Sequence, residues 1–263
     1  MKNGKIVRAG VAQWDIRLGD LAYNMEKAEQ FIEDFSIKRA DLAVLPEMWS
    51  SGFDYGNLDI HAEKTPEILD GLKNMSASSG ITICGSLPEK KDGRIFNSMF
   101  VIDSGEVKSS YSKIHLFTPT GEDRGFAAGE SAVICQTKAG ILGLIICYDL
   151  RFPELCRALT LAGAEIIVCS AQWPEARIHH WNTLLAARAI ENQVFIVASN
   201  RCGKDFSIIY GGSSRIISPY GIVIGECGAG EESVVEELDP EEMKNFRKMM
   251  PCLEHIKPGA YFI

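Results

Sequence analysis

The stretch that most constrains the fold runs from Ile141 to Glu154, ILGLIICYDLRFPE. Its apolar run, residues 141–146, is bounded by turn signals and is typical of a buried strand. Pro153 opens a helical pattern, and proline is favoured in the first turn of a helix. Cys147 therefore lies where a core strand ends and a helix is about to begin. An α/β protein carries a nucleophile at such a point, although a free cysteine is more often a small buried hydrophobe.

The same order of strand and helix recurs along the chain. Further buried strands are predicted by apolar runs at residues 5–13, 40–45, 81–86, 164–170 and 194–199. Helices are predicted over 21–37, from Thr65 and Pro66 to Gly80, over 178–192 and from Asp239. Ribbons of antiparallel strands, predicted over 91–111 and 211–226, argue against a single doubly wound sheet. We therefore predict an α/β protein with two facing sheets, each covered by helices.

The bulk properties limit the classes of partner. No linker or composition shift interrupts the chain, so we predict a single domain over residues 1–263, with residues 251–263 as a C-terminal tail. The net charge of −8 argues against nucleic acid or an anionic membrane as a main partner. We expect no transmembrane helix, because no stretch approaches the roughly 18 apolar residues that one needs, and no signal peptide.

The cysteines predict a compartment rather than a metal site. The eight cysteines form no CxxC pair and have no zinc-type spacing with the five histidines. We expect no metal and no cofactor. Several of the cysteines lie inside apolar runs, which predicts free thiols in a reducing cytoplasm.

Three reactive side chains, Glu47, Lys113 and Cys147, each follow a predicted strand. Because strand ends on one rim of a sheet are where α/β active sites collect, we expect the three to lie together. A carboxylate whose pKa is raised by burial can take the proton of a thiol, and the thiolate is the attacking form. An ammonium favours that thiolate and the oxyanion formed at an attacked carbonyl. The N–H of Tyr148 is a candidate for the second oxyanion donor.

Other functions fit parts of this pattern. A Ser/His/Asp hydrolase is disfavoured because the chain lacks GxSxG. A Cys/His peptidase is less excluded, since His115 lies close to Lys113 in sequence, although we expect His115 to be structural. A nucleotide-binding glycine fingerprint does not follow the first strand. A non-catalytic binding protein stays open as an alternative, because a fold alone does not prove activity.

Three blocks of the chain resemble the signature blocks of the nitrilase superfamily of carbon–nitrogen hydrolases. They are residues 45–48 (LPEM), 113–117 (KIHLF) and 146–154 (ICYDLRFPE), and they occur in the family's order of Glu, Lys and Cys. Residues 181–193 also resemble the family. The similarity extends over about residues 6–217, which is most of the chain.

The resemblance implies a four-layer α-β-β-α sandwich and a thiol mechanism. By resemblance, Glu47 is the general base, Lys113 stabilises the tetrahedral intermediate and Cys147 is the nucleophile. The amide carbonyl is attacked, ammonia leaves and water hydrolyses the thioester. The family has a second active-site glutamate in the loop after the lysine block, and Glu122 fits this place better than its neighbour Asp123. The resemblance also implies a homodimer, with the tail crossing between subunits.

Within the family, residues 147–154 and 171–177 look most like the ω-amidase branch. Those enzymes remove ammonia from small amides that carry a carboxylate, such as 2-oxoglutaramate or succinamate. Nitriles, carbamoyl amines and deaminated glutathione are alternative substrates, because the same three residues act on them in other branches of the family.

A carboxylate on the substrate calls for an arginine in the pocket, because guanidinium binds carboxylate bidentately. Arg151 and Arg177 are the candidates, although Arg151 has the alternative of pairing with Asp149 or Glu154. The predicted substrate-binding residues are therefore Phe117, Tyr148, Arg151, Trp173 and Arg177.

Overall fold

Two six-stranded sheets form the centre of the protein in a computed structural model that describes residues 4–206 and 208–260. The first sheet has the order β14 (Glu232–Leu238), β1 (Val7–Gln13), β2 (Leu42–Val44), β3 (Thr82–Lys91), β4 (Arg94–Asp103) and β5 (Glu106–Ser112). The second has the order β13 (Val223–Glu226), β12 (Arg215–Ile217), β9 (Phe195–Asn200), β8 (Ile166–Ala171), β7 (Gly140–Ile146) and β6 (Ile134–Thr137). A separate ribbon pairs β10 (Cys202–Asp205) with β11 (Ile208–Gly211).

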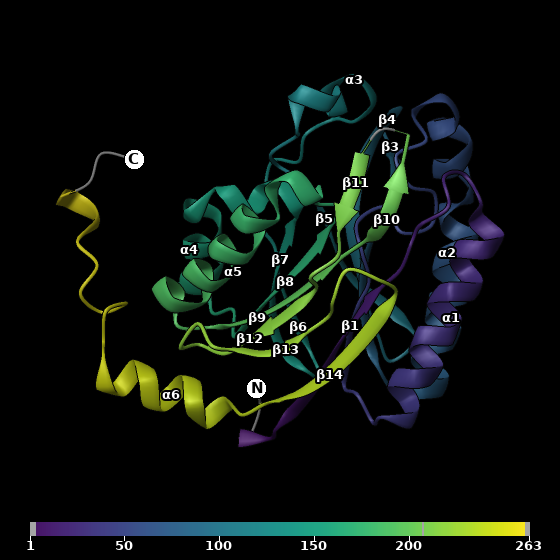
Figure 1. Cartoon of the computed structure of the whole chain (residues 1–263). Helices are drawn as coiled ribbons and strands as arrows, with labels where there is room; N and C mark the ends of the chain where they lie inside the picture. The colour runs from purple at the N-terminus through teal and green to yellow at the C-terminus, as the bar shows by residue number, and fades with distance from the viewer. Residues whose placement is uncertain (1–3, 207, 261–263) are drawn as a thin grey trace.

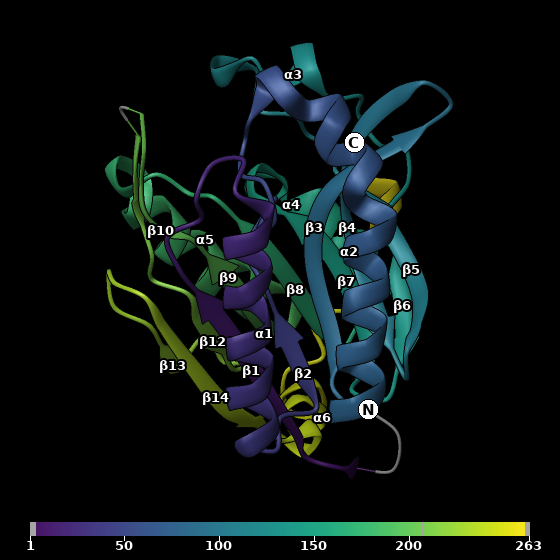
Figure 2. The ribbon, with the colours of Figure 1, turned by 90° about the vertical axis from the view of Figure 1, so that its right-hand side faces the viewer.

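Helices cover the outer faces of both sheets. The α-helices are α1 (Leu21–Ile37), α2 (Leu58–Ser79), α3 (Glu122–Gly125), α4 (Pro153–Leu161), α5 (Ile178–Asn192) and α6 (Pro240–Met249). Short 3-10 helices are η2 (Tyr55–Asn57), η3 (Thr118–Thr120), η4 (Cys147–Arg151), η5 (Glu175–Arg177) and η6 (Pro258–Ala260). Figures 1 and 2 show α1 and α2 on one outer face and α4 and α5 on the other. The predicted α-β-β-α sandwich is confirmed. Within the described ranges, no helix has the length and apolar character that crossing a membrane requires.

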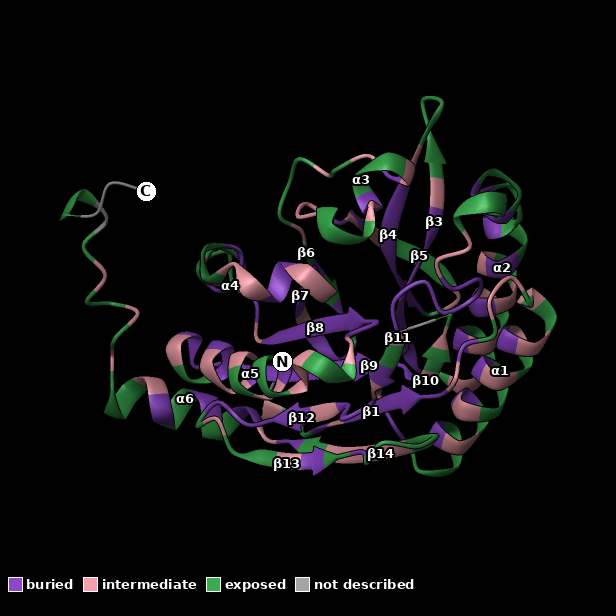
Figure 3. Ribbon diagram, turned by 45° about the horizontal axis from the view of Figure 1, so that its top comes forward, coloured by how far each residue is buried: buried purple, intermediate pink, exposed green. Residues whose placement is uncertain are grey.

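Alternation along the strands builds two cores. In β1, Val7, Ala9 and Val11 point between the sheets and join the larger core, which also contains residues of the second sheet and α5. Gly10 points the other way, where a Cβ would lie 2.8 Å from the ring of Phe35 on α1. Only a residue without a side chain permits that close approach. Figure 3 shows the resulting pattern, with central strands such as β1 and β8 buried and the outer helix faces exposed.

The second helix differs from its prediction. It begins at Leu58, not at Thr65, so Pro66 lies inside it and Thr65 does not cap it. Thr65 Oγ1 instead donates to the carbonyl oxygen of Pro88, at 2.5 Å. Apolar residues before and after the proline are buried against the core. Their burial stabilises a continuous helix and outweighs the loss of the backbone hydrogen bond that proline cannot donate. The first helix, in contrast, spans residues 21–37 as predicted, with Asp20 accepting from Tyr23 N.

Two elements beyond the predicted set complete the fold. Strand β14 pairs antiparallel with β1, so that Val7 faces Leu238 near the opposite end of the chain. The β10–β11 ribbon extends from the rim where β9 ends. Both elements depend on pairings that are distant in sequence or that involve short, partly polar segments. The β10–β11 ribbon borders the cavity described next.

Candidate active site

The two sheets are joined at the rim where their parallel strands end. Ser170 Oγ at the end of β8 donates to the Leu45 carbonyl oxygen just after β2, at 2.7 Å. Ser199 Oγ in β9 donates to the Ala12 carbonyl oxygen in β1, at 2.6 Å. These contacts hold the strand ends of the two sheets together, and the predicted reactive residues follow several of those ends.

Cys147 lies at the first position of η4, directly after β7. Its φ of 46° is in the left-handed region, which a residue with a side chain adopts only when its surroundings hold it there. The carboxylate of Asp149 provides much of that hold. It accepts hydrogen bonds from Ile146 N at 2.9 Å, from the Tyr111 hydroxyl at 2.7 Å and from His115 N at 3.0 Å.

His115 braces this turn as well. Its Nδ1 lies 2.8 Å from Asp149 Oδ1, and its ring stacks on Phe152 with 3.6 Å between centroids. This placement agrees with the structural role expected from the sequence. It directs the imidazole to Asp149.

Lys113 is held between two carboxyl groups in the interior. Its Nζ lies 2.8 Å from Glu47 Oε1, and 2.8 and 2.9 Å from the two oxygens of Glu122. The side chains of all three residues are at most 2% exposed. Glu122 also accepts a hydrogen bond from Phe117 N at 2.6 Å, so the start of α3 is tied to the lysine block. The structure therefore brings Glu47, Lys113, Glu122 and Cys147 to one place.

Burial and mutual charge set the protonation of this cluster. Burial raises the pKa of the Cys147 thiol well above its usual value, and the neighbouring Glu47 raises it further. Burial also raises the pKa of Glu47, with Lys113 opposing and Glu122 reinforcing the shift. Burial alone would lower the pKa of Lys113, but Glu47 and Glu122 raise it well above its ordinary value. The resting cluster thus contains a neutral thiol next to a carboxylate of raised basicity and a firmly protonated amine.

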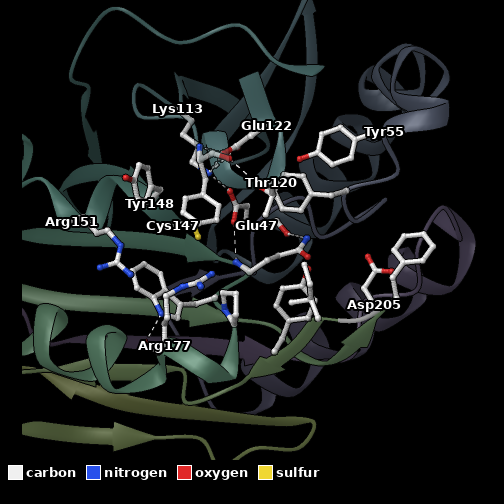
Figure 4. Close-up of a pocket in the computed structure, with 18 residues that line it drawn as sticks. Glu47, Tyr55, Lys113, Thr120, Glu122, Cys147, Tyr148, Arg151, Arg177 and Asp205 are labelled. Atoms are coloured by element: carbon white, nitrogen blue, oxygen red, sulfur yellow. Dashed lines mark hydrogen bonds and ion pairs between the residues drawn. The ribbon is translucent and has the colours of Figure 1, made fainter. Parts of the chain in front are cut away.

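A cavity of about 200 Å³ opens onto this cluster. All five predicted substrate-binding residues line it, as do Glu47, Lys113, Glu122 and Cys147. Figure 4 shows Arg151 and Arg177 on one side of Cys147 and Asp205 on the other. The remaining lining residues have no role predicted from the sequence; they are Phe53, Tyr55, Thr120, Gln172, Pro174, Asp205, Phe206, Ile208 and Tyr210.

The two cavity arginines rest on aromatic rings. The guanidinium of Arg177 lies 5.4 Å from the ring centroid of Phe117, and that of Arg151 lies 4.7 Å from that of Trp173. Arg151 also contacts His180 Nδ1, at 3.3 Å. Among residues 4–206 and 208–260, neither guanidinium is within ion-pair distance of a carboxylate, so the alternative pairing of Arg151 with Asp149 or Glu154 is wrong.

Residues without a predicted role hold Glu47 in place. Gln172 N donates to Glu47 Oε2 at 2.9 Å, and Gln172 Nε2 donates to the main-chain oxygen of Glu47 at 2.8 Å. The fully buried Arg201 donates in turn to Gln172 Oε1 at 3.1 Å and pairs with Asp15 at 2.8 Å. Asn97 donates to Glu47 from the other side. An amide side chain within a buried strand carries no sequence signal of such a contact.

A partly buried thiol, a buried amine and two buried carboxyl groups beneath a small cavity are the groups that hydrolysis through a cysteine nucleophile requires. Comparison with known proteins gives the family. Residues 8–248 match the family described as carbon-nitrogen hydrolase, and the chain belongs to that family. It is a hydrolase acting on carbon–nitrogen bonds and a member of the nitrilase superfamily.

Individual relatives agree with this assignment. The chain is 38% identical to the 2-oxoglutaramate amidase of Bacillus subtilis, over 95% of this chain and 97% of that protein. A carbon–nitrogen hydrolase superfamily protein of Xanthomonas campestris, 28% identical, superposes with a TM-score of 0.89 over 98% of this chain and 99% of that one. An amidase from Nesterenkonia, in which acrylamide has added to the active-site cysteine, is 25% identical, with a TM-score of 0.84 over 94% and 98% of the two chains.

Proposed function

We propose that the protein is an ω-amidase, which hydrolyses the terminal amide of small carboxylate-bearing amides such as 2-oxoglutaramate or succinamate. The observation that carries the proposal is the cavity itself. Its floor presents the thiol, amine and carboxyl groups of the cluster, and its wall presents Arg151 and Arg177 without a carboxylate of the described chain as partner. The identity to the Bacillus subtilis 2-oxoglutaramate amidase supports the same substrate class.

The first half of the reaction forms a thioester. Glu47 takes the proton from the thiol of Cys147 while the sulfur attacks the amide carbon. The oxyanion that forms is stabilised by the ammonium of Lys113 and by the N–H of Tyr148, which lies in the first turn of η4, where N–H groups have no partner within the helix. Glu47 then gives its proton to the amide nitrogen, and ammonia leaves.

The second half releases the acid. Glu47 takes a proton from water, and the resulting hydroxide attacks the thioester carbon. The carbon–sulfur bond breaks, the proton returns to the sulfur and the site is restored. Glu122 keeps Lys113 aimed at the reacting carbonyl through both of its oxygens.

The two arginines of the cavity select the substrate. Arg177 and Arg151 bind the remote carboxylate, and the rings of Phe117 and Trp173 line the apolar part of the chain between the two ends. A small diacid monoamide places a carboxylate at one end of the cavity and an amide at the other. Neutral amides, nitriles and carbamoyl amines lack the group that these arginines bind.

Ammonia release from succinamate and 2-oxoglutaramate tests the proposal. Cys147→Ala is expected to abolish release while leaving the circular dichroism spectrum and the melting temperature nearly unchanged. The matched control is Cys252→Ala, because Cys252 is an exposed thiol outside the cavity and its loss is expected to leave the rate unchanged. Activity retained in Cys147→Ala would refute the nucleophile. A carbamoyl amine, deaminated glutathione or a nitrile hydrolysed faster than either amide would refute the substrate class.

The chain is further proposed to act as one hydrolase domain that forms a homodimer in the cytoplasm. Figure 1 shows the segment after α6 extending away from the sheets, which suits a contact with a second copy. Large apolar side chains are exposed on α4, on α5, at the end of α6, directly after α6 and in the turn before β13; they are Leu161, Ile190, Met249, Met250 and Ile222. The free state of all eight cysteines suits a reducing compartment. The predicted tail, residues 251–263, extends beyond the described residues at 261–263.

Light scattering after size-exclusion chromatography tests the dimer. Met249→Glu is expected to shift the molar mass from two chains to one. Ile60→Glu is the matched control, since Ile60 is also a strongly exposed apolar residue but lies on α2, away from α6. A molar mass of one chain for the unmodified protein would contradict the proposal.

A further inference from the structure

Asn97 lies behind the catalytic cluster rather than in the cavity. It is in β4, its side chain is 0% exposed, and it is not among the residues that line the cavity. Any effect of this side chain on the reaction must therefore pass through the groups that it touches. Those groups are three of the four residues assigned to the chemistry.

The contacts of Asn97 join these three residues. Its Nδ2 donates to Glu47 Oε1 at 2.8 Å and to Glu122 Oε1 at 3.3 Å. Its main-chain oxygen accepts from Lys113 N at 2.9 Å. Because both side-chain neighbours are carboxyl groups, the amide nitrogen must be the atom that faces them. The Asn97 Oδ1 atom then points away and accepts no hydrogen bond from the described residues.

These contacts make the two carboxylate oxygens of Glu47 different. Oε1 receives both Lys113 Nζ and Asn97 Nδ2, so its accepting positions are occupied. Oε2 receives only the main-chain N–H of Gln172 and keeps an accepting position for another proton. Glu47 and the thiol of Cys147 line the same cavity, and the charge of the carboxylate raises the pKa of the thiol. The oxygen that exchanges the proton with sulfur is therefore Oε2.

We propose that Asn97 is a positioning residue, which fixes the rotation of the Glu47 carboxylate so that Oε2 faces the thiol, and which ties Glu122 to the same frame. In acylation the S–H bond breaks and an Oε2–H bond forms, and that proton then passes to the departing nitrogen. The inference rests on the proposed function, because it takes Glu47 as the base.

The neutral amide suits this place better than a charged or an apolar side chain. A second cation next to Glu47 would stabilise its ionised form and weaken it as a base. An apolar side chain would leave Oε1 with Lys113 alone and would allow the carboxylate to rotate. Asn97 supplies two hydrogen bonds and no charge, so the carboxylate is aligned and stays basic.

The pH dependence of succinamate hydrolysis tests this role in Asn97→Leu and in the smaller variant Asn97→Ala. We expect kcat to fall about 10- to 100-fold and KM to stay within about twofold, because Asn97 does not line the cavity. The acid limb of kcat/KM is expected to move up by about one to two pH units, since a donor to the ionised carboxylate has been removed. The rate of Cys147 alkylation by iodoacetamide, measured over the same pH range, is expected to shift in the same direction and needs no turnover.

Asn24→Leu is the matched control. Asn24 is also fully buried, and its Nδ2 donates twice, to the main-chain oxygens of Arg17 and Ser50, away from the cavity. We expect this variant to lower the melting temperature and to leave the acid limb where it is. A purely structural Asn97 would behave in the same way.

The variant Glu47→Gln separates the two ways in which the reasoning can fail. If the acid limb of alkylation disappears in Glu47→Gln but stays unshifted in both Asn97 variants, the positioning role is refuted and the proposed base stands. If the limb persists in Glu47→Gln, the proposed base itself is refuted. A rise in KM that accounts for the whole loss in the Asn97 variants would also refute positioning, because it would mean a changed binding site.

Discussion

Asp149→Asn tests how the turn that carries the nucleophile is held. The wild-type carboxylate is fully buried and accepts from Ile146 N, Tyr111 hydroxyl and His115 N at 2.7–3.0 Å. Asparagine keeps the size of the side chain but turns one acceptor oxygen into an NH2 donor. The Tyr111 hydroxyl can rotate to accept from it. The main-chain N–H groups of Ile146 and His115 can only donate. Either orientation of the amide therefore leaves one of these N–H groups facing the new NH2 group.

The expected loss of stability follows from the one hydrogen bond that Asp149→Asn leaves unmade. An unmade bond at a buried N–H costs about 1–3 kcal/mol, and the remaining bonds lose the strengthening that the charge gave them. We expect the free energy of unfolding to fall by about 2–4 kcal/mol and the melting temperature by about 4–12 °C. Ile146 directly precedes Cys147, whose left-handed φ of 46° depends on this support. Since a displacement of about 1 Å of a reacting group can cost roughly 100-fold in rate, kcat is expected to fall by about that factor.

Thermal melts and succinamate kinetics on the same preparations measure both effects. Asp103→Asn is the control, because Asp103 is also a buried carboxylate that accepts from a hydroxyl and a main-chain N–H, those of Thr82 and Lys138, at a site remote from the cavity. It is expected to lose stability but to keep its kcat per folded molecule. If Asp149→Asn lost stability and kept kcat in the same way, the link between the Asp149 bonds and the aim of the thiol would be refuted.

Three further outcomes are expected. Arg177→Lys should raise KM about tenfold for succinamate and leave KM for the neutral butyramide unchanged, because an ammonium does not bind a carboxylate bidentately. Equal changes in KM for the two substrates in steady-state kinetics would contradict the assignment of Arg177. The acid limb of kcat/KM should lie at higher pH than for an ordinary glutamate, because the base must be deprotonated and burial raises the pKa of Glu47. An initial-rate profile with its acid limb near pH 4 would argue against Glu47 as the base. Incubation with EDTA should leave the rate unchanged, because every proposed step uses protein groups and water, and a loss of rate that added divalent metal restores would overturn that mechanism.

The sequence predicts the strand-end residues well for a physical reason. Glu47 and Cys147 each follow an apolar run, and a buried strand that ends at a rim has few places to put a polar side chain. Lys113 follows β5, the return strand that the ribbon pattern predicts. The two-sheet architecture follows from the same runs, together with the ribbons. Local periodicity likewise predicts α1, because its buried stripe and its cap lie within a single stretch of chain.

Local sequence patterns do not predict features that depend on contacts between distant parts of the chain. Asn97 lies within a largely buried strand, and only the folded structure brings Glu47, fifty residues away, to its amide. Strand β14 forms because β1 offers an edge more than two hundred residues earlier in the chain. The start of α2 was misplaced because Pro66 is a local signal, whereas the burial that carries the helix through it is tertiary.

The arrangement around Lys113 explains why the site contains two glutamates. During the proposed reaction Glu47 alternates between a carboxylate and a carboxylic acid. In the acid form it no longer balances the buried ammonium, and an uncompensated charge in the interior is strongly unfavourable. Glu122 contacts the same Nζ through both oxygens and has no proton to carry in the mechanism, so it remains as a counter-ion throughout. One carboxyl group is thereby free to move protons because the other keeps the amine charged and in place for the oxyanion.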